Sequence, residues 1–221
     1  MGAVIGEILP LAVGIAISPI SIIAVILMLL SPRAKGASVG FMIGCVAGII
    51  VAVVVFTLLA SVIPQRGGAS TTSGVIKIIF GVLLLFLALR QWRGRPAKGE
   101  QAVMPKWMSA IDSMTIGKAM GLGFLLSTVN PKNLIMAVSA GVIIGGAGLA
   151  LGQAAVVIVI FVVLAACTVI IPVIGYLIAA ARLVDPLDRL RGWLVENNAT
   201  IMAVLLLVIG VALIGKGIAH F

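Results

Sequence analysis

Two short polar motifs, each built around a proline, interrupt apolar stretches of this sequence. The first contains Ser18, Pro19 and Ser21, and the second contains Asn130, Pro131, Lys132 and Asn133. Proline removes one intrahelical hydrogen bond, so the motifs should free the carbonyls of Ile15 and Ser127 and break two helices. The serine and asparagine side chains, with the N–H groups of the restarting helices, are suited to binding an anionic group. We therefore take these residues as candidate substrate-binding residues.

The composition places both motifs inside a membrane. Hydrophobic side chains make up 62% of the 221 residues and charged ones 10%, whereas globular chains are about half apolar and about a quarter charged. The chain is therefore predicted to be an integral membrane protein rather than a soluble domain. The net charge of +9 comes from basic residues between the apolar stretches. This pattern fits the positive-inside rule better than nucleic-acid binding, so no nucleic-acid partner is expected.

Six apolar segments reach the length of about 20 residues that a helix needs to cross the bilayer. They cover residues 3–30, 37–63, 73–92, 117–144, 149–181 and 199–217. We expect an all-α fold in a single transmembrane domain over residues 1–221. Two connectors, 93–116 and 182–198, are polar, and each should contain a short amphipathic helix. One of these should begin at Asp185 and Pro186, and the other should contain Trp107, Ile111 and Met114.

The two halves of the chain resemble each other, because Pro19 and Pro131 occupy matching places in the first and fourth segments. Three helices per half is an odd number, so the second half should be inverted in the membrane, as in many secondary transporters. Repeat 1 covers about 1–92, a cytoplasmic loop covers 93–116, and repeat 2 covers about 117–221. With this loop inside, eleven of the fifteen Lys and Arg residues are cytoplasmic and two are outside. Both termini should therefore face outward.

Lys132 lies within the second motif, where a charge costs at least about 2.5 kcal/mol on insertion scales. It could neutralise an anionic group in transit, or it could snorkel or pair with carbonyls freed by the helix break. Glu7 is the acid within an apolar segment. It could be a proton-coupling carboxylate or the partner of a lysine such as Lys77, which could itself snorkel outward.

Gly36, Gly40, Gly44 and Gly48 form a ladder of small residues at four-residue spacing. Such ladders let two helices approach closely. The ladder predicts helix packing, either within one subunit or in a homodimer.

Other chemistry is not supported by the sequence. Residues 210–216 resemble a phosphate-binding loop, but Gly217 stands where Ser or Thr is required. Cys45 and Cys167 are isolated thiols, and one histidine and one core carboxylate do not make a metal site or a hydrolase. We expect no catalytic residues, no metal, no cofactor and no enzyme activity.

The motifs together resemble a known family. They are Ser18-Pro19-Ile20-Ser21, Ser31-Pro32-Arg33-Ala34, Pro105-Lys106-Trp107-Met108, Ile111-Asp112-Ser113, Gly117-Lys118-Ala119 and Asn130-Pro131-Lys132-Asn133. This set resembles the GAP family of actinobacterial glycopeptidolipid- or sulfolipid-addressing proteins, within the six-helix lysine exporter (LysE) superfamily. The resemblance covers essentially the whole chain. It implies a bacterial plasma-membrane protein that moves polar lipids toward the cell envelope, and it leaves the cargo open.

The leading hypothesis is an exporter or flippase of a polar glycolipid or similar anionic amphipathic molecule, working by alternating access. Its partners would be membrane lipids, the substrate and possible lipid-synthesis or export proteins. One alternative is an exporter of a small solute such as an amino acid. Another is a non-transporting accessory subunit of a lipid-export machine.

Overall fold

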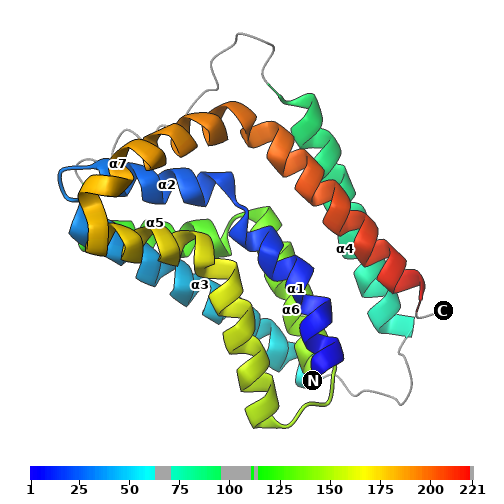
Figure 1. Ribbon diagram of the computed structural model, residues 1–221. Helices are drawn as coiled ribbons and strands as arrows, with labels where there is room; N and C mark the ends of the chain where they lie inside the picture. Colours follow the sequence, from blue (N-terminus) through cyan, green and yellow to red (C-terminus); the bar gives the residue numbers. More distant parts are fainter. Residues whose placement is uncertain (63–70, 96–110, 112–113, 220–221) are drawn as a thin grey trace.

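The computed structural model describes residues 1–62, 71–95, 111 and 114–219, and this described part contains helices and no strand (Figure 1). The expected all-α fold is confirmed. The helices are α1 (Gly2–Ala16), α2 (Pro19–Leu30), α3 (Ala34–Val62), α4 (Thr71–Arg93), α5 (Ile116–Thr128), α6 (Pro131–Gly145) and α7 (Leu151–Ile218).

Four helical stretches are long and apolar enough to cross a membrane, so the chain is a multi-pass membrane protein. They are α3, α4 and the two halves of α7, Leu151–Ala180 and Arg182–Ile218. Helices α1 and α2 form one further candidate span, bent by 50°. Helices α5 and α6 are shorter apolar helices that meet at Asn130 and together occupy the predicted fourth segment. Each proline motif therefore lies at a helix break, as predicted.

The second half of α7 differs from the prediction. The chain turns at Ala179, the residue with non-helical backbone angles inside α7, and a helix then runs from Arg182 to Ile218. The prediction of a separate short helix beginning at Asp185 and Pro186 was wrong. Proline this close to a helix start loses only one hydrogen bond, so the helix continues through it. The other predicted amphipathic helix lies mostly outside the described residues.

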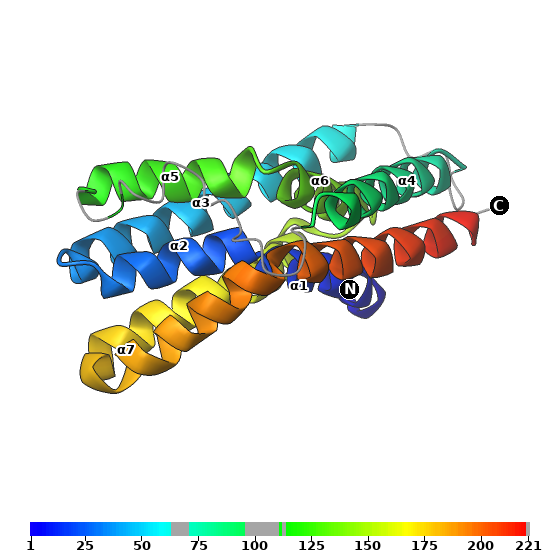
Figure 2. The same ribbon diagram turned by 90° about the horizontal axis from the view of Figure 1, so that it is seen from above.

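Both termini lie in the half of the molecule away from the turn between α2 and α3, the C-terminus at the edge and the N-terminus nearer the middle in Figure 2 (Figures 1 and 2). The opposite end is formed by the turn between α2 and α3, the start of α5 and a sharp bend of α7. We call it the basic end, because it contains the cationic side chains of Arg33, Lys35, Lys118 and Arg182.

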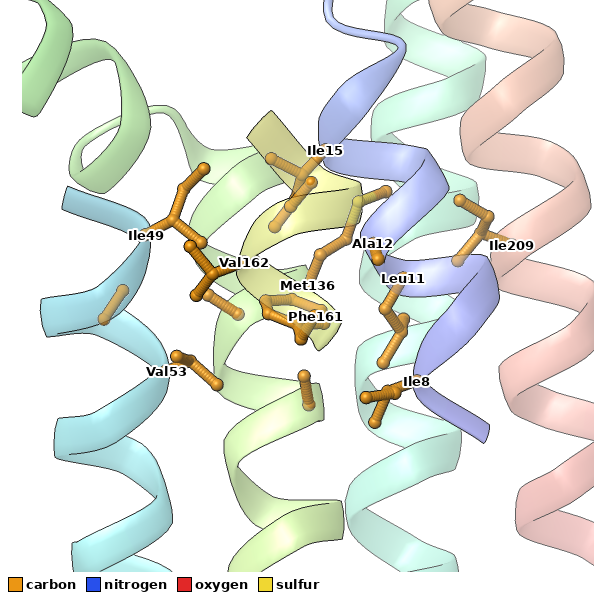
Figure 3. Close-up of a cluster of buried hydrophobic side chains, with 14 of the residues drawn as sticks. Ile8, Leu11, Ala12, Ile15, Ile49, Val53, Met136, Phe161, Val162 and Ile209 are labelled. Atoms are coloured by element: carbon orange, nitrogen blue, oxygen red, sulfur yellow. The ribbon is translucent and has the colours of Figure 1, made fainter. Parts of the chain in front are cut away.

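Buried apolar side chains form two separate clusters. The first lies toward the termini and includes Ile8, Leu11, Met136, Phe161 and Ile209 (Figure 3). The second lies toward the basic end and is built from the buried side of α2 together with parts of α3, α5 and α7. Helices α1 and α6 belong to the first cluster, whereas α2 and α5 belong to the second. The two proline breaks therefore fall at the boundary between the clusters.

The glycine ladder packs α3 against α5 within the chain. A Cβ atom on Gly40 would collide with the carbonyl of Ile116, and one on Gly44 would collide with the carbonyl of Met120. The residue numbers increase together along the contact, so the two helices run parallel. The packing prediction is confirmed, and the partner helix is α5 of the same chain.

Candidate functional site

A polar layer separates the two apolar clusters. Each of its residues lies in the chain between a residue of the first cluster and a residue of the second. The layer consists of Ser18, Ser21, Ser127, Lys132, Asn133, Thr168 and Asn198. It coincides with both helix breaks, so the sequence motifs and the polar layer describe the same level of the molecule.

Lys132 links the two halves of the chain across this layer. Its side chain is buried, with 2% exposed. The ammonium donates to the carbonyl of Gly14 over 2.8 Å and to that of Ile17 over 3.4 Å. The last carbonyls of a helix lack intrahelical donors and carry partial negative charge, so a cation is stabilised there. The predicted pairing with carbonyls freed by the break is confirmed, although the acceptors are Gly14 and Ile17 rather than Ile15.

Among the residues that the structure describes, no carboxylate pairs with the cation of Lys132. The ion pairs found within the described ranges join Lys77 to Glu7 and Arg191 to Asp188. Carbonyl dipoles therefore provide the stabilisation that an acid would otherwise give. Because a buried charge is costly unless it is paired, this arrangement leaves a cation that is suited to an anionic ligand.

Thr168 provides a second contact to the end of α1. Its hydroxyl donates to the carbonyl of Ala16 over 2.6 Å, from the first half of α7. Side chains from α6 and α7 thus donate to three carbonyls near the first break, those of Gly14, Ala16 and Ile17. Thr168 gives no signal in the sequence, because a lone threonine in an apolar helix ordinarily bonds within its own helix.

Ser18 occupies the N-cap position of α2 without making a side-chain cap bond. Ser18 is 1% exposed, and its hydroxyl oxygen is buried without a hydrogen-bond partner. Ser21 is buried in the first turn of the same helix. Buried polar groups are nearly always bonded, so an unpartnered hydroxyl beside a helix N-terminus marks a position where a ligand can bind.

The second break is satisfied by its own residues. The side-chain oxygen of Asn130 accepts from the backbone N–H of Lys132 over 3.1 Å and so caps α6, with Pro131 exposed at the first helical position. Asn133 is 2% exposed, and its amide donates to the carbonyl of Leu126 over 3.2 Å. The side-chain oxygen of Asn133 is buried without a partner.

Asn198 adds a third unpartnered group at this level, since its side-chain oxygen is also buried without a hydrogen-bond partner. The sequence analysis assigned it to a polar connector and did not consider it. Helical continuation through residues 182–198 is what brings it between the two clusters.

Glu7 and Lys77 form an ion pair away from the polar layer. The Lys77 ammonium lies 3.0 Å from the Glu7 carboxylate, and Lys77 is buried. The prediction that Glu7 is the partner of Lys77 is confirmed, whereas outward snorkelling of Lys77 is not observed. A coupling role for Glu7 stays a prediction.

An apolar groove lies between α1 and the second half of α7 and reaches the first helix break at Ile17. It has a volume of about 540 Å³. Pro10, Val13 and Ile17 form one wall, and Val204 and Val208 lie on the other. Asn197 and Thr200 supply polar groups near Ile17. The groove is therefore apolar along its length and polar where it meets the first break.

A family model described as Sap, sulfolipid-1-addressing protein, matches residues 8–219. The chain belongs to this family. The match includes both helix breaks and the polar layer, and the family's description associates the chain with lipid addressing. The family motif residues 105–108 and 112–113 lie outside the described residues. No curated protein and no solved structure matches the chain.

Proposed function

We propose that this protein is a membrane transporter, not an enzyme, that exports or flips a polar anionic lipid or similar amphipathic molecule by alternating access. The observation that carries the proposal is Lys132, a buried cation that is held by carbonyls and paired with no acid of the described part of the chain. A substrate carrying a sulfate, phosphate or carboxylate group would supply the missing negative charge.

The substrate's headgroup would bind in the polar layer. Lys132 would pair with its anionic group, and the free N-terminus of α2 with the Ser18 hydroxyl would donate hydrogen bonds. The Asn133 side-chain oxygen would accept a bond from a headgroup hydroxyl. Binding of the anion would compete with the carbonyls of Gly14 and Ile17, so it would loosen the contact between α1 and α6.

The substrate's hydrocarbon would lie in the groove between α1 and the second half of α7. This groove is apolar along its length and ends at Ile17, next to Ser18. A lipid could therefore enter sideways from the bilayer while its headgroup reaches the polar layer. A small hydrophilic solute would make no use of such a groove.

The wider architecture follows the same proposal. Both termini lie in the same half of the molecule, which fits an even number of crossings, with α5 and α6 together forming the sixth span (Figures 1 and 2). We infer two inverted three-helix repeats in the bacterial plasma membrane with both termini outside, as in the lysine exporter superfamily that the sequence resembles.

The decisive experiment is deletion of the gene in its native host, followed by comparison of surface-extractable lipids with total lipids. We expect a lipid that is present in cells but depleted from the surface. Wild-type protein should restore it, and Lys132→Gln should not, whereas Lys77→Gln serves as the matched buried-lysine control.

Two outcomes would contradict the proposal. Unchanged surface lipids would favour export of a small solute such as an amino acid. Full rescue by both Lys132→Gln and Asn130→Ala, together with failure of variants in the 93–106 loop or at Trp107, would indicate a non-transporting accessory subunit.

A further inference from the structure

One face of α7 carries charged side chains from the basic end to the level of the polar layer. A spacing of three or four residues places them on one side of the helix, turned away from Leu187 and Leu194 of the second apolar cluster. The exposed residues at this spacing are Arg182, Asp185, Arg189, Trp193, Glu196 and Thr200. We call this face the charged stripe.

The charged stripe ends at Thr200. Further along the same face, the exposed residues are Val204, Leu207, Val208 and Val211. A membrane helix presents such side chains to hydrocarbon. Because the change occurs on one face and within about one turn, the two parts of this face contact different environments. The boundary between them lies next to Asn198 in the chain, at the level of the polar layer.

The neighbouring helices expose apolar side chains at the depth where α7 exposes charges. Ile171 lies between Val169 and Val173 of the second cluster, and it is 67% exposed. Leu125 of α5 and Ile43 of α3, from helices that build the same cluster, are 54% and 49% exposed. These faces are suited to hydrocarbon, so the second cluster lies at membrane depth and the charged stripe lies there with it.

Hydrocarbon is a poor environment for the charged stripe. A charge in the bilayer core costs at least about 2.5 kcal/mol on insertion scales, and such residues almost always pair or face water. In the described ranges, Asp188 and Arg191 form an ion pair on the flank of the stripe, whereas neither Arg189 nor Glu196 takes part in an ion pair. Water or lipid headgroups must therefore reach Arg189 and Glu196.

A second copy of the chain is poorly suited to cover the charged stripe. In a two-fold dimer whose axis is perpendicular to the membrane, the same residues face each other at equal depth. Arg189 would face the partner's Arg189, and Glu196 would face the partner's Glu196. Like charges at close range repel, so this face favours a different occupant.

The charged stripe is continuous with the apolar groove beside α1. Trp193 and Thr200 belong to the stripe and also line the groove, which reaches Ile17 at the first helix break. Val204 and Val208 continue the wall of the groove beyond Thr200. An amphipathic lipid matches both surfaces, because its polar part can lie on the stripe while its hydrocarbon lies in the groove.

We propose that the charged stripe is a hydrated path along which the headgroup of a membrane lipid moves between the basic end and the polar layer. The guanidinium groups of Arg182 and Arg189 contact the anionic group of the headgroup, and the carboxylates of Asp185 and Glu196 accept hydrogen bonds from its donors. This path rests on the proposed function, because it delivers a lipid to the layer that contains Lys132.

The first test measures hydration of the stripe in lipid nanodiscs, where both faces of the bilayer are open to water. Arg189→Cys is compared with Ile171→Cys, and wild type gives the background from Cys45 and Cys167. A water-soluble maleimide should label Arg189→Cys at least about tenfold faster, since the reactive thiolate forms in water and not in hydrocarbon. Equal rates in the two variants, whether fast or slow, would overturn the path.

The second test measures lipid flipping in vesicles. Arg189→Leu with Glu196→Leu should slow flipping by about fivefold or more, which is the factor that one cation contributes to headgroup binding near a surface. The matched control is Asp188→Leu with Arg191→Leu, which removes one acid and one base from the same helix at positions that do not line the groove. This control should change flipping by less than about twofold. Normal flipping by the stripe variant, or equal loss in both variants, would overturn the path.

Failure of the path and failure of the transport proposal give different results. Normal flipping by the stripe variant together with loss in Lys132→Gln would overturn the path and leave the transport proposal intact. Wild-type protein that flips no lipid would contradict the transport proposal, and the path with it. The labelling rates do not depend on transport, so they still show whether the charged stripe is hydrated.

Discussion

The two helix breaks have similar sequences but are held in different ways. At the break between α1 and α2, the bonds to the α1 carbonyls come from Lys132 and Thr168, which are 118 and 152 residues away from Gly14 and Ala16. At the break between α5 and α6, the bonds from Asn130 and Asn133 span 2 and 7 residues. The first break is held by tertiary contacts, and the second is held by its own loop.

This difference indicates which break would change during the proposed transport. The hydrogen bonds at the second break keep their geometry when α5 and α6 move together as one unit. The bonds at the first break exist only while α1 packs against α6 and α7. We infer that the backbone at the first break moves. The second break would keep its structure and hold Lys132 next to the first. An element with two arrangements is what alternating access requires.

The largest expected effect comes from removing the contact between the breaks. Lys132→Met should reduce lipid flipping by more than tenfold, because hydrogen bonds to a charged group contribute about 1.5–3 kcal/mol each. Flipping can be measured with purified protein in vesicles, by dithionite bleaching of a fluorescent anionic lipid. Lys77→Met is the control: it removes a buried lysine outside the polar layer and should leave more than half of the rate. Equal loss in both variants would mean that the two breaks do not communicate through Lys132.

A smaller effect is expected from the second long-range bond. Thr168→Val keeps the side-chain shape but leaves the Ala16 carbonyl without this donor, so the free energy of unfolding should fall by about 1–3 kcal/mol. Because the bond holds the mobile break, flipping should change as well. Reversible unfolding in detergent gives the first quantity and the vesicle assay the second. A stability loss without any change in flipping would show that the first break does not move.

The local break should respond in stability alone. Asn130→Ala removes the cap of α6 and should lower the free energy of unfolding by about 1 kcal/mol, whereas Asn130→Ser retains a capping oxygen and should restore most of it. Flipping by Asn130→Ser should match that of wild type. If Asn130→Ser instead folds normally and fails to flip lipid, the Asn130 amide contacts the substrate.

The smallest stability effect is expected at Ser18. Its hydroxyl has no partner, so Ser18→Ala should change the free energy of unfolding by less than about 0.5 kcal/mol or raise it slightly. Flipping should nevertheless slow several-fold, because the hydroxyl would bind the headgroup. The same two assays check both values. A destabilisation above about 1 kcal/mol would show that the hydroxyl is already bonded, and the two breaks would then be more alike than the structure indicates.

The sequence predicted the positions of the breaks because proline acts locally. Pro19 and Pro131 each remove a backbone donor, and that effect does not depend on the rest of the fold. Glu7 and Lys77 could also be paired from the sequence, since an acid and a lysine that both lie within apolar segments stabilise each other as an ion pair. The glycine ladder predicted close packing for the same kind of reason.

The hydrogen-bond partners of Lys132 and the positions of Thr168 and Asn198 depend on tertiary packing and could not be predicted from the sequence. Lys132 bonds to Gly14 and Ile17 instead of the expected Ile15, because the reach of its side chain depends on how α6 packs against α1. Thr168 and Asn198 carry no local signal, and only the fold places them between the two apolar clusters. The helix through Pro186 depends on burial of Leu187 and Leu194 in the second cluster, which outweighs the local signal for a new helix start.

The long-range bonds at the first break can form only after the second half of the chain has been synthesised. Lys132 is 115 residues further along the chain than Ile17, so at about 5–20 residues per second the ribosome adds it about 6–23 s later. During that interval the carbonyls of Gly14 and Ile17 lack the Lys132 donor, and backbone groups without partners are costly in hydrocarbon. We therefore expect the first broken helix to stay beside the translocon or another aqueous surface during this interval. It can settle in the lipid only after the second half of the chain has been made.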